Sequence, residues 1–382
     1  MGQAERKSFD QFGTTPTYLA RAAKDVVFAL IDGEATLFSE TAQELHALNP
    51  VAALIWCRLD ESGDPNDACA GLVEAGVEPV AAARHVDDAI REWLERGLFR
   101  ADFPPMQRRH ACAFQIDDEK FVVETADRDL SRQIAGMFDP DPSWTVGVAA
   151  RFQVVDVGDS LHVHFEDRRI AVCDAVELLP TIKALATARI LARPRREIMF
   201  HAACLTRGDR TLLLSGAPGT GKTTLALHLV ANGFLYGGDD IALIAPDGSV
   251  RGLPLAPTVK SGAWPIVARL RPDLASALIH RRPDGEQAKY LALGAVDSAP
   301  HPAGWLVFLR RAPGAGVEFA PLDGVEAMRR VIEGAYSSSQ RLSLAGFRAL
   351  RRMLAGARSV ELVYERSDDA AAALCDFCYG QR

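Results

Sequence analysis

The residues best suited to chemistry lie near the middle of the chain, in the segment Gly216-Ala217-Pro218-Gly219-Thr220-Gly221-Lys222-Thr223. This is a complete G-x-x-x-x-G-K-[ST] pattern, whose glycines let backbone N–H groups turn inward around phosphate oxygens. Lys222 supplies a mobile cation for the β- and γ-phosphates, and the Thr223 hydroxyl is suited to bind Mg²⁺. The pattern therefore predicts a site for a nucleoside triphosphate, with ATP and Mg²⁺ as the expected cofactors. The predicted phosphate-binding residues are Gly216, Gly219, Thr220, Gly221, Lys222 and Thr223, with Thr224 as packing or a secondary contact.

Both sides of this segment carry the elements that must position it. Residues 211–215, TLLLS, form a short apolar run typical of a buried strand, and residues 223–230 continue as a helix that ends at Asn232-Gly233. In this strand–loop–helix order the positive end of the helix faces the bound phosphates.

Two adjacent carboxylates, Asp239 and Asp240, stand between apolar runs about sixteen residues after Thr223. An apolar setting tolerates such a pair poorly unless a cation is near. One carboxylate can hold the metal while the other accepts the proton of an acceptor hydroxyl, as phosphoryl transfer requires. The alternative is a turn with two solvated aspartates.

These residues resemble the HPr kinase/phosphorylase family, whose catalytic domain has a histidine before the phosphate-loop strand and paired aspartates after its helix. The matching pieces are Phe200-His201-Ala202-Ala203, the loop GAPGTGKTT, and Gly233-Phe234 through Asp239-Asp240. The resemblance implies that His201 lies beside the acidic base, that Asp239 is the proton acceptor, and that Asp240 and Thr223 hold Mg²⁺. The two aspartate roles could be exchanged, and a histidine such as His201, taken alone, is more often a core residue.

The resemblance extends over about residues 196–365 and is weaker in its later part. Lys260 and Lys289 are the cations expected to bind nucleotide or substrate phosphate, whereas Arg310 and Arg311 could equally be a solvated strand end. Residues 281–286 resemble a mobile loop beside the site, in which Glu286 could assist the metal. This segment departs from the family's signature, which leaves the phosphorylase reaction and HPr as acceptor open.

The N-terminal region begins with a predicted hairpin over residues 26–38 around Asp32-Gly33, a dipeptide that two-residue hairpin turns favour. Helices are predicted after Asn49-Pro50 and after Asp64-Pro65, because each pair supplies an N-cap and a first-turn proline. A third helix is predicted from about Pro79 to Arg96, and Gly97 ends it.

This order of elements is winged-helix-like and resembles the PqqD family of precursor-peptide chaperones. The resemblance is carried by Leu48-Asn49-Pro50, Ile55-Trp56, Trp93-Leu94 and Gly97-Leu98-Phe99. It implies that a leader peptide adds as an extra strand beside the hairpin and packs on the third helix. The alternative is a helical cap that binds no peptide.

Between these regions, strands are predicted at 121–125 and 161–165, and a helix at 176–192. His162 and His164 alternate on one strand face, which we expect to be solvated rather than to bind a metal. The predicted domains are a tail at 1–25, a PqqD-like domain at 26–103, a mixed connecting subdomain at 104–195 and a catalytic domain at 196–382. The predicted fold class is α/β, with a P-loop kinase domain of the HPr-kinase/PEP-carboxykinase-like type, the winged-helix-like domain and the α+β subdomain.

Composition narrows the possible partners and the compartment. The net charge of −7 argues against a general affinity for nucleic acid, and no apolar run reaches the roughly 20 residues that span a bilayer. The seven cysteines are odd in number and scattered through apolar segments, which favours reduced thiols and a cytoplasmic location. Cys375 and Cys378 form one C-x-x-C, expected to be a structural helix face. A homo-oligomer is possible because the kinase family is often oligomeric.

Taken together, these features predict an ATP- and Mg²⁺-dependent kinase. Its substrate would be a Ser or Thr hydroxyl of a ribosomally made precursor peptide, or of a small protein, held by the N-terminal domain. One alternative is a kinase for a small metabolite, and another is a non-catalytic, nucleotide-gated peptide-binding protein. The sequence leaves the acceptor residue undetermined.

Overall fold

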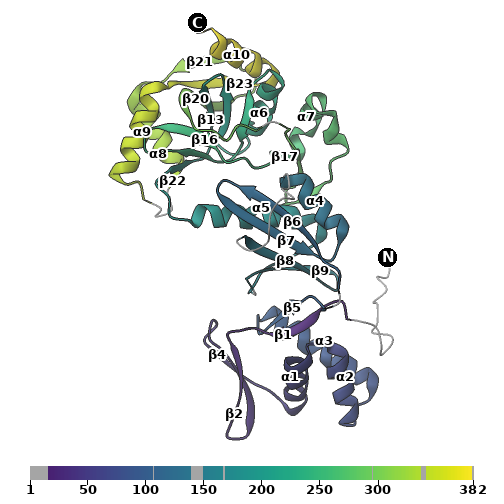
Figure 1. Ribbon diagram of the computed structural model, residues 1–382. Helices are drawn as coiled ribbons and strands as arrows, with labels where there is room; N and C mark the ends of the chain where they lie inside the picture. The colour runs from purple at the N-terminus through teal and green to yellow at the C-terminus, as the bar shows by residue number, and fades with distance from the viewer. Residues whose placement is uncertain are drawn as a thin grey trace. The chain divides into compact units, whose positions relative to one another are not determined.

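The computed structural model describes residues 16–105, 107–138, 149–166, 168–294, 296–336 and 341–380 (Figure 1). Within these ranges the chain divides into two compact units. The first contains residues 16–112, 122–132 and 149–178, and the second contains residues 113–121, 133–138 and 179–380. In the described part of the chain, no helix has both the length and the apolar character needed to cross a membrane.

The N-terminal part of the first unit combines short strands with three helices. Its elements, in chain order, are β1 (Leu19–Ala22), β2 (Val26–Ile31), β3 (Glu34–Ser39), β4 (Glu44–Ala47), α1 (Pro50–Ser62), α2 (Pro65–Glu74), α3 (Pro79–Glu95) and β5 (Phe99–Asp102). Strands β2, β3 and β4 form an antiparallel sheet in that order, and β1 pairs with β5. The predicted hairpin is confirmed as β2–β3, with Asp32 and Gly33 at φ 51° and 87°. Strand β4 was absent from the prediction, because its four residues give too short a pattern.

The three helices begin where the sequence indicates. The side chains of Asn49, Asp64 and Glu78 each accept a hydrogen bond from a backbone N–H of the first turn, and a proline follows each of them. Gly63, at φ 75°, ends α1 in the left-handed conformation that glycine adopts without strain. The predicted helix starts are therefore confirmed, and they result from local capping chemistry.

An aromatic cluster forms the centre of this helical core. The rings of Trp56 and Phe99 stack with centroids 4.5 Å apart, and Trp93 meets Trp56 edge-on at 5.2 Å. All three side chains are buried. The residues that carry the resemblance to PqqD are thus the residues that hold α1, α3 and β5 together.

A five-stranded sheet follows, in the order β10-β9-β8-β7-β6, and in it β9 pairs antiparallel with both β8 and β10. Its strands are β6 (His110–Ile116), β7 (Glu119–Thr125), β8 (Ala150–Val157), β9 (Ser160–Phe165) and β10 (Arg168–Cys173), and its neighbours in the chain are α4 (Arg128–Phe138) and α5 (Ala175–Ala192). The strands predicted at 121–125 and 161–165 and the helix predicted at 176–192 are confirmed as β7, β9 and α5.

The expected solvation of His162 and His164 is wrong. Strand β9 lies between β8 and β10, and the two histidines are only 5% and 1% exposed. Their alternation with apolar residues indicated a two-sided strand, but it did not show that the sheet is covered on the histidine face. Burial lowers the pKa of His162 to about 4, and the nearby Arg169 guanidinium adds to the shift.

The second unit is built on a large mixed sheet. Its described strands run β14-β12-β13-β20-β16-β15-β11-β22, with β23 also beside β20 and β21 beside β23. Their bounds are β11 (Ile198–Phe200), β12 (Ala203–Arg207), β13 (Arg210–Ser215), β14 (Leu235–Gly238), β15 (Ala242–Ile244), β16 (Ser249–Gly252), β20 (His301–Arg311), β21 (Glu318–Pro321), β22 (Ala335–Tyr336) and β23 (Arg358–Tyr364). Strands β13, β20 and β23 are parallel to one another.

Helices cover both faces of this sheet (Figure 1). Along β13, Leu212 and Leu214 pack with α6 (Lys222–Ala231) and α10 (Ser367–Tyr379), whereas Leu213 faces α8 (Gly324–Gly334) and α9 (Leu344–Gly356). This alternation is the period of two of a strand that is buried on both sides. Cys375 and Cys378 lie on α10 as free thiols, so their assignment to a helix is confirmed.

A smaller three-stranded sheet, in the order β17-β19-β18, lies within the same unit. Its strands and the helices between them are β17 (Thr258–Lys260), the short 3₁₀ helices η2 (Ser261–Ala263) and η3 (Pro272–Ala275), α7 (Trp264–Leu270), β18 (His280–Arg281) and β19 (Gln287–Tyr290).

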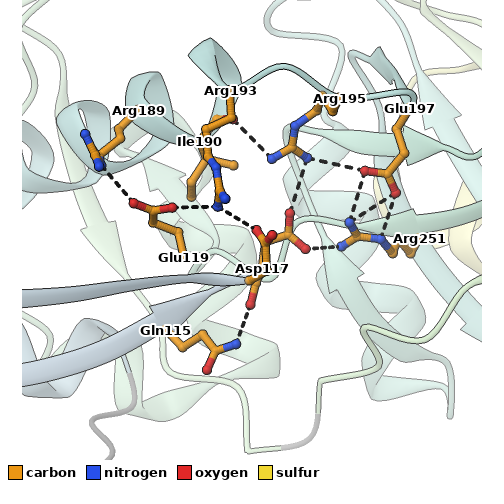
Figure 2. A network of polar contacts seen from close by, with 10 residues as sticks. Gln115, Asp117, Glu119, Arg189, Ile190, Arg193, Arg195, Glu197 and Arg251 are labelled. Carbon is orange, nitrogen blue, oxygen red and sulfur yellow. Dashed lines mark hydrogen bonds and ion pairs between the residues drawn. The ribbon is translucent and has the colours of Figure 1, made fainter. Parts of the chain in front are cut away.

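Figure 2 shows a network of ion pairs that holds the C-terminal end of α5. Arg189 Nε lies 2.9 Å from a carboxylate oxygen of Glu119, the first residue of β7. Asp117, in the turn between β6 and β7, lies 3.2 Å from Arg195 and 2.7 Å from Arg251 of β16. Paired charges of this kind are sensitive to geometry because each buried charge needs its partner. The network therefore ties α5 to the sheet.

His162 makes acid stability testable. Its folded pKa of about 4 lies below the ordinary value of about 6.5, so the folded state keeps the ring neutral. The resulting stabilisation is complete above pH 6.5 and is lost as the pH falls from 6.5 towards 4, because only the unfolded state gains a proton there. We expect the loss of unfolding free energy between pH 7.5 and 4.5 to be smaller in His162→Phe by about 1–2 kcal/mol.

Urea titrations at the two pH values measure this difference. The matched control is His85→Gln, an exposed histidine of α3. If His162→Phe loses as much stability with acid as the parent protein, burial of His162 is not a source of the pH dependence.

Candidate functional site

The predicted strand–loop–helix order is confirmed. Strand β13 ends at Ser215, directly before the glycine-rich segment, and α6 begins at Lys222 within it. Gly219 and Gly221 have φ values of 83° and 95°, which strain any residue with a side chain. A Cβ on Gly216 would lie 2.9 Å from the carbonyl oxygen of Leu309, and one on Gly221 would lie 2.8 Å from the hydroxyl of Tyr364. The glycines therefore fit both the backbone conformation and the close approach of β20 and β23.

The loop is also held by hydrogen bonds. The Tyr364 hydroxyl donates to the carbonyl of Thr220, which joins the end of β23 to the loop across 144 residues of sequence. The Thr220 hydroxyl donates to the Ala217 carbonyl at 2.8 Å. Thr224, in the first turn of α6, is buried. The loop conformation is thus fixed in part by Tyr364, which sequence reasoning did not assign to it.

Lys222 turns its ammonium back into the loop. Its Nζ atom donates to the carbonyls of Gly216 at 2.8 Å and of Ala217 at 3.4 Å. The side chain is 8% exposed, and burial lowers its pKa, opposed by the nearby Asp240 and Asp239 carboxylates. The cation predicted for phosphate binding is therefore in the loop and close to the acid pair.

The central contact of the site joins Thr223 to Asp239. The Thr223 hydroxyl donates to Asp239 Oδ2 at 2.9 Å, and the backbone N–H of Thr258 donates to the same oxygen at 3.3 Å. Asp239 is 1% exposed, and its Oδ1 atom has no hydrogen-bond partner among the described residues. Burial raises the pKa of Asp239 to about 7, with the Asp240 carboxylate as the second cause and Lys183 acting in the opposite direction. The alternative of two solvated aspartates is therefore wrong for Asp239.

Asp240 and His201 meet through the backbone. His201 Nδ1 lies 3.0 Å from the carbonyl oxygen of Asp240, so this nitrogen carries the proton that it donates. The Asp240 side chain itself is 45% exposed. Burial lowers the pKa of His201, and the Lys222 ammonium adds to the shift, which favours a neutral ring. The structure thus brings His201 beside the acid pair, in contact with its backbone.

Lys183, on α5, is a member of this cluster that sequence reasoning missed. Its Nζ atom lies 3.9 Å from Asp240 Oδ2 and donates to the Thr258 hydroxyl at 2.7 Å. One signal was available in the sequence: Lys183 is the single lysine in the otherwise largely apolar helix at 175–192. A buried cation in an apolar helix needs a partner, although the sequence does not identify which one.

The two other predicted lysines have their partners outside this cluster, although the charge of Lys260 contributes to the lowered pKa of Lys222. Lys260 Nζ forms an ion pair with Glu286, which lies in the tight turn between β18 and β19. Lys289 is 8% exposed and donates to the carbonyl of Leu274 at 2.8 Å. Segment 281–286 is therefore a hairpin in this structure. Arg310 and Arg311 lie at the end of β20, where they contact Glu361 and the Glu365 carbonyl.

The residues at the site fit a bound Mg²⁺ in their chemistry. Among the described residues, no three histidine, cysteine or carboxylate side chains form a group that could hold a metal by themselves. Mg²⁺ in nucleotide sites is bound by one or two protein oxygens together with substrate phosphates and water. The hydroxyl of Thr223 and the unpartnered, buried Oδ1 of Asp239 are oxygens of that kind.

Comparison with known proteins identifies the N-terminal region. Residues 34–98 match the family model of coenzyme PQQ synthesis protein D (PqqD). The match begins with the first residue of β3, includes β4 and the helices α1, α2 and α3, and ends just after α3. Strand β2 therefore lies outside the PqqD match. The search of curated proteins found no match to the chain.

Gly221 offers a test of the loop geometry. Gly221→Ala should lower the free energy of unfolding by about 1–3 kcal/mol, because the residue has a left-handed φ and the new methyl would meet the Tyr364 hydroxyl. Chemical denaturation measures the change. Gly262→Ala is the matched control, since a Cβ there has no neighbour within 4 Å. Equal stability of the two variants would contradict the described loop conformation.

Proposed function

We propose that the protein is an ATP- and Mg²⁺-dependent kinase that phosphorylates a Ser or Thr hydroxyl of a ribosomally made precursor peptide. One observation carries the catalytic part: Thr223, in the first turn of α6, donates to the buried Asp239, and the half-exposed Asp240 follows directly. A hydroxyl, a buried carboxylate and a reachable carboxylate beside a phosphate-type loop are the groups that phosphoryl transfer needs. The proposed enzyme is a kinase of the HPr-kinase-like type.

The geometry favours an exchange of the two aspartate roles that the resemblance implies. Asp239 is bonded to Thr223 and has little contact with solvent, so we assign it with Thr223 to the Mg²⁺ side. Asp240 is accessible to an acceptor, so we assign it as the general base. Bound Mg²⁺ would supply positive charge that stabilises the phosphate oxygens.

The remaining roles follow from position. The loop amides and Lys222 bind the β- and γ-phosphates, and the neutral His201 ring holds the backbone of Asp240. The acceptor hydroxyl gives its proton to the Asp240 carboxylate while its oxygen forms a bond to the γ-phosphorus. The bond from that phosphorus to the bridging oxygen breaks, and ADP leaves.

The PqqD match supports a peptide as the acceptor. PqqD domains bind precursor peptides, and residues 34–98 match that family. These residues would therefore hold the leader of the precursor peptide while the core of the same peptide is modified. Within the described residues, β4 has β3 as its one strand neighbour, and its His46 lies 3.3 Å from Arg96, directly after α3. A leader strand added to the outer edge of β4 would have both a backbone partner and α3 beside it. We therefore propose this edge as the leader site.

Binding of the leader would also assist a permissive active site. A short flexible linker raises the local concentration of the acceptor to about the millimolar range. Little affinity for the acceptor residue itself would then be needed. A small-metabolite kinase, or a nucleotide-gated peptide binder without turnover, would not gain from this arrangement, and both remain second candidates.

Phosphate transfer is the decisive test. Full-length protein, γ-labelled ATP and the precursor peptide encoded beside the gene should yield labelled peptide. Lys222→Met should reduce the rate by at least about 10²-fold, because it removes the cation that stabilises charge in transfer. Lys120→Met, an exposed lysine of β7, should leave the rate unchanged.

The same assay separates the candidates. Labelled small hydroxyl compounds without labelled peptide would indicate a metabolite kinase. Binding of both ATP and peptide without labelled product would indicate the non-catalytic alternative. Either outcome would reject the peptide-kinase proposal.

The leader site has a separate test. Leu45 of β4 is 60% exposed, and Leu30 of β2 is 68% exposed. Leu45→Lys should weaken leader binding by roughly tenfold, the cost of one lost apolar contact of 1–2 kcal/mol. Leu30→Lys, at the opposite edge of the sheet, should bind normally in fluorescence anisotropy with a labelled leader. The reverse pattern would move the leader site to β2.

A further inference from the structure

The side chain of Lys183 extends from α5, and its buried ammonium contacts the segment that leads into β17. The side chain is 8% exposed. Its Nζ atom donates to the carbonyl of Ala256 at 2.8 Å and to the hydroxyl of Thr258 at 2.7 Å. Two of the three ammonium protons are thus engaged by neutral oxygens of one short segment, which fixes the position of the charge.

The same ammonium contacts the acid pair by two routes. Asp240 Oδ2 lies 3.9 Å away, and the Thr258 that accepts from Lys183 donates its backbone N–H to Asp239 Oδ2 at 3.3 Å. The ring of Tyr290 lies on another side, with its centroid 5.3 Å from Nζ. Lys183 therefore acts on Asp240 directly and on Asp239 through Thr258.

Two adjacent carboxylates repel each other, and a positive charge at a fixed point nearby offsets that repulsion. The fixed point is provided by α5, whose C-terminal end is held by the ion pairs of Asp117 and Glu119 (Figure 2). The hydrogen bonds, ion pair and ring contact of the Lys183 ammonium in the described part of the chain are with Ala256, Thr258, Asp240 and Tyr290, and none of these belongs to the loop 216–223. Its position is therefore suited to orient the carboxylates rather than to bind phosphate.

We propose that Lys183 is a positioning residue, which holds the Asp240 carboxylate and the Thr258 segment in the arrangement that phosphoryl transfer uses. The inference rests on the proposed function of the same site. It adds α5 to the elements that form the candidate site, although α5 precedes both the loop and the large sheet in the sequence.

The kinetic test compares Lys183→Met, Lys183→Arg and the control Lys120→Met in the full-length protein. Lys183→Met should lower kcat by about 10²-fold, the typical loss from a misplacement of about 1 Å, while KM for ATP stays within about threefold. Lys183→Arg restores the positive charge and should recover at least about tenfold of the lost rate. Equal losses in the two variants, or a raised KM for ATP with kcat retained, would overturn the proposal.

Amide hydrogen exchange provides a second test of the proposal, one that does not depend on enzymatic activity. The amide of Thr258 is the donor to Asp239, so Lys183→Met should accelerate exchange in the peptide that contains residues 255–260, relative to Lys120→Met. Unchanged exchange would reject the positioning role even if the protein proves to be a kinase. If exchange is faster but the protein transfers no phosphate, the kinase proposal is rejected, whereas the link from Lys183 through Thr258 to Asp239 is retained. Thermal unfolding of the variants checks that the fold is retained.

Discussion

The burial of the Asp239 carboxylate is the constraint on which the candidate site depends. A carboxylate removed from water is tolerated only with hydrogen bonds or opposite charge nearby. Asp239 has the Thr223 hydroxyl and the Thr258 amide as donors, and the Lys183 ammonium reaches it through Thr258. Each donor comes from a different element, so the end of β14, the start of α6, β17 and α5 must meet at one point. The glycine-rich loop lies beside this point because Thr223 belongs to both.

Features set by short-range chemistry were predictable from the sequence. The caps at Asn49 and Asp64, the turn at Asp32-Gly33 and the loop between β13 and α6 depend on neighbouring residues, and the structure confirms them. A mixed α/β fold is confirmed as well, and the family-model match confirms the resemblance to PqqD over residues 34–98. The kinase type of the second unit stays a prediction.

Features set by distant contacts were not predictable in this way. Lys183 meets Thr258 across 75 residues, and Tyr364 meets Thr220 across 144. The burial of His162 depends on the strands and side chains that cover β9, which a pattern of alternating residues cannot reveal. A single sequence specifies that a buried lysine or histidine needs compensation, but only the folded arrangement identifies the partner.

The ion pairs at the β6–β7 hairpin restrict where a gene fusion could join the second unit to another domain. Asp117 and Glu119 precede the glycine-rich loop by about a hundred residues of chain, yet they pair with Arg189 of α5, with Arg195 and with Arg251 of β16 in the large sheet. A crossover at the start of β11 would separate these charges and α5 from the sheet that they contact. Recombination that transplants the unit intact must carry residues 113–121, 133–138 and the part of α5 from residue 179 onward, so the inheritable module is discontinuous along the gene.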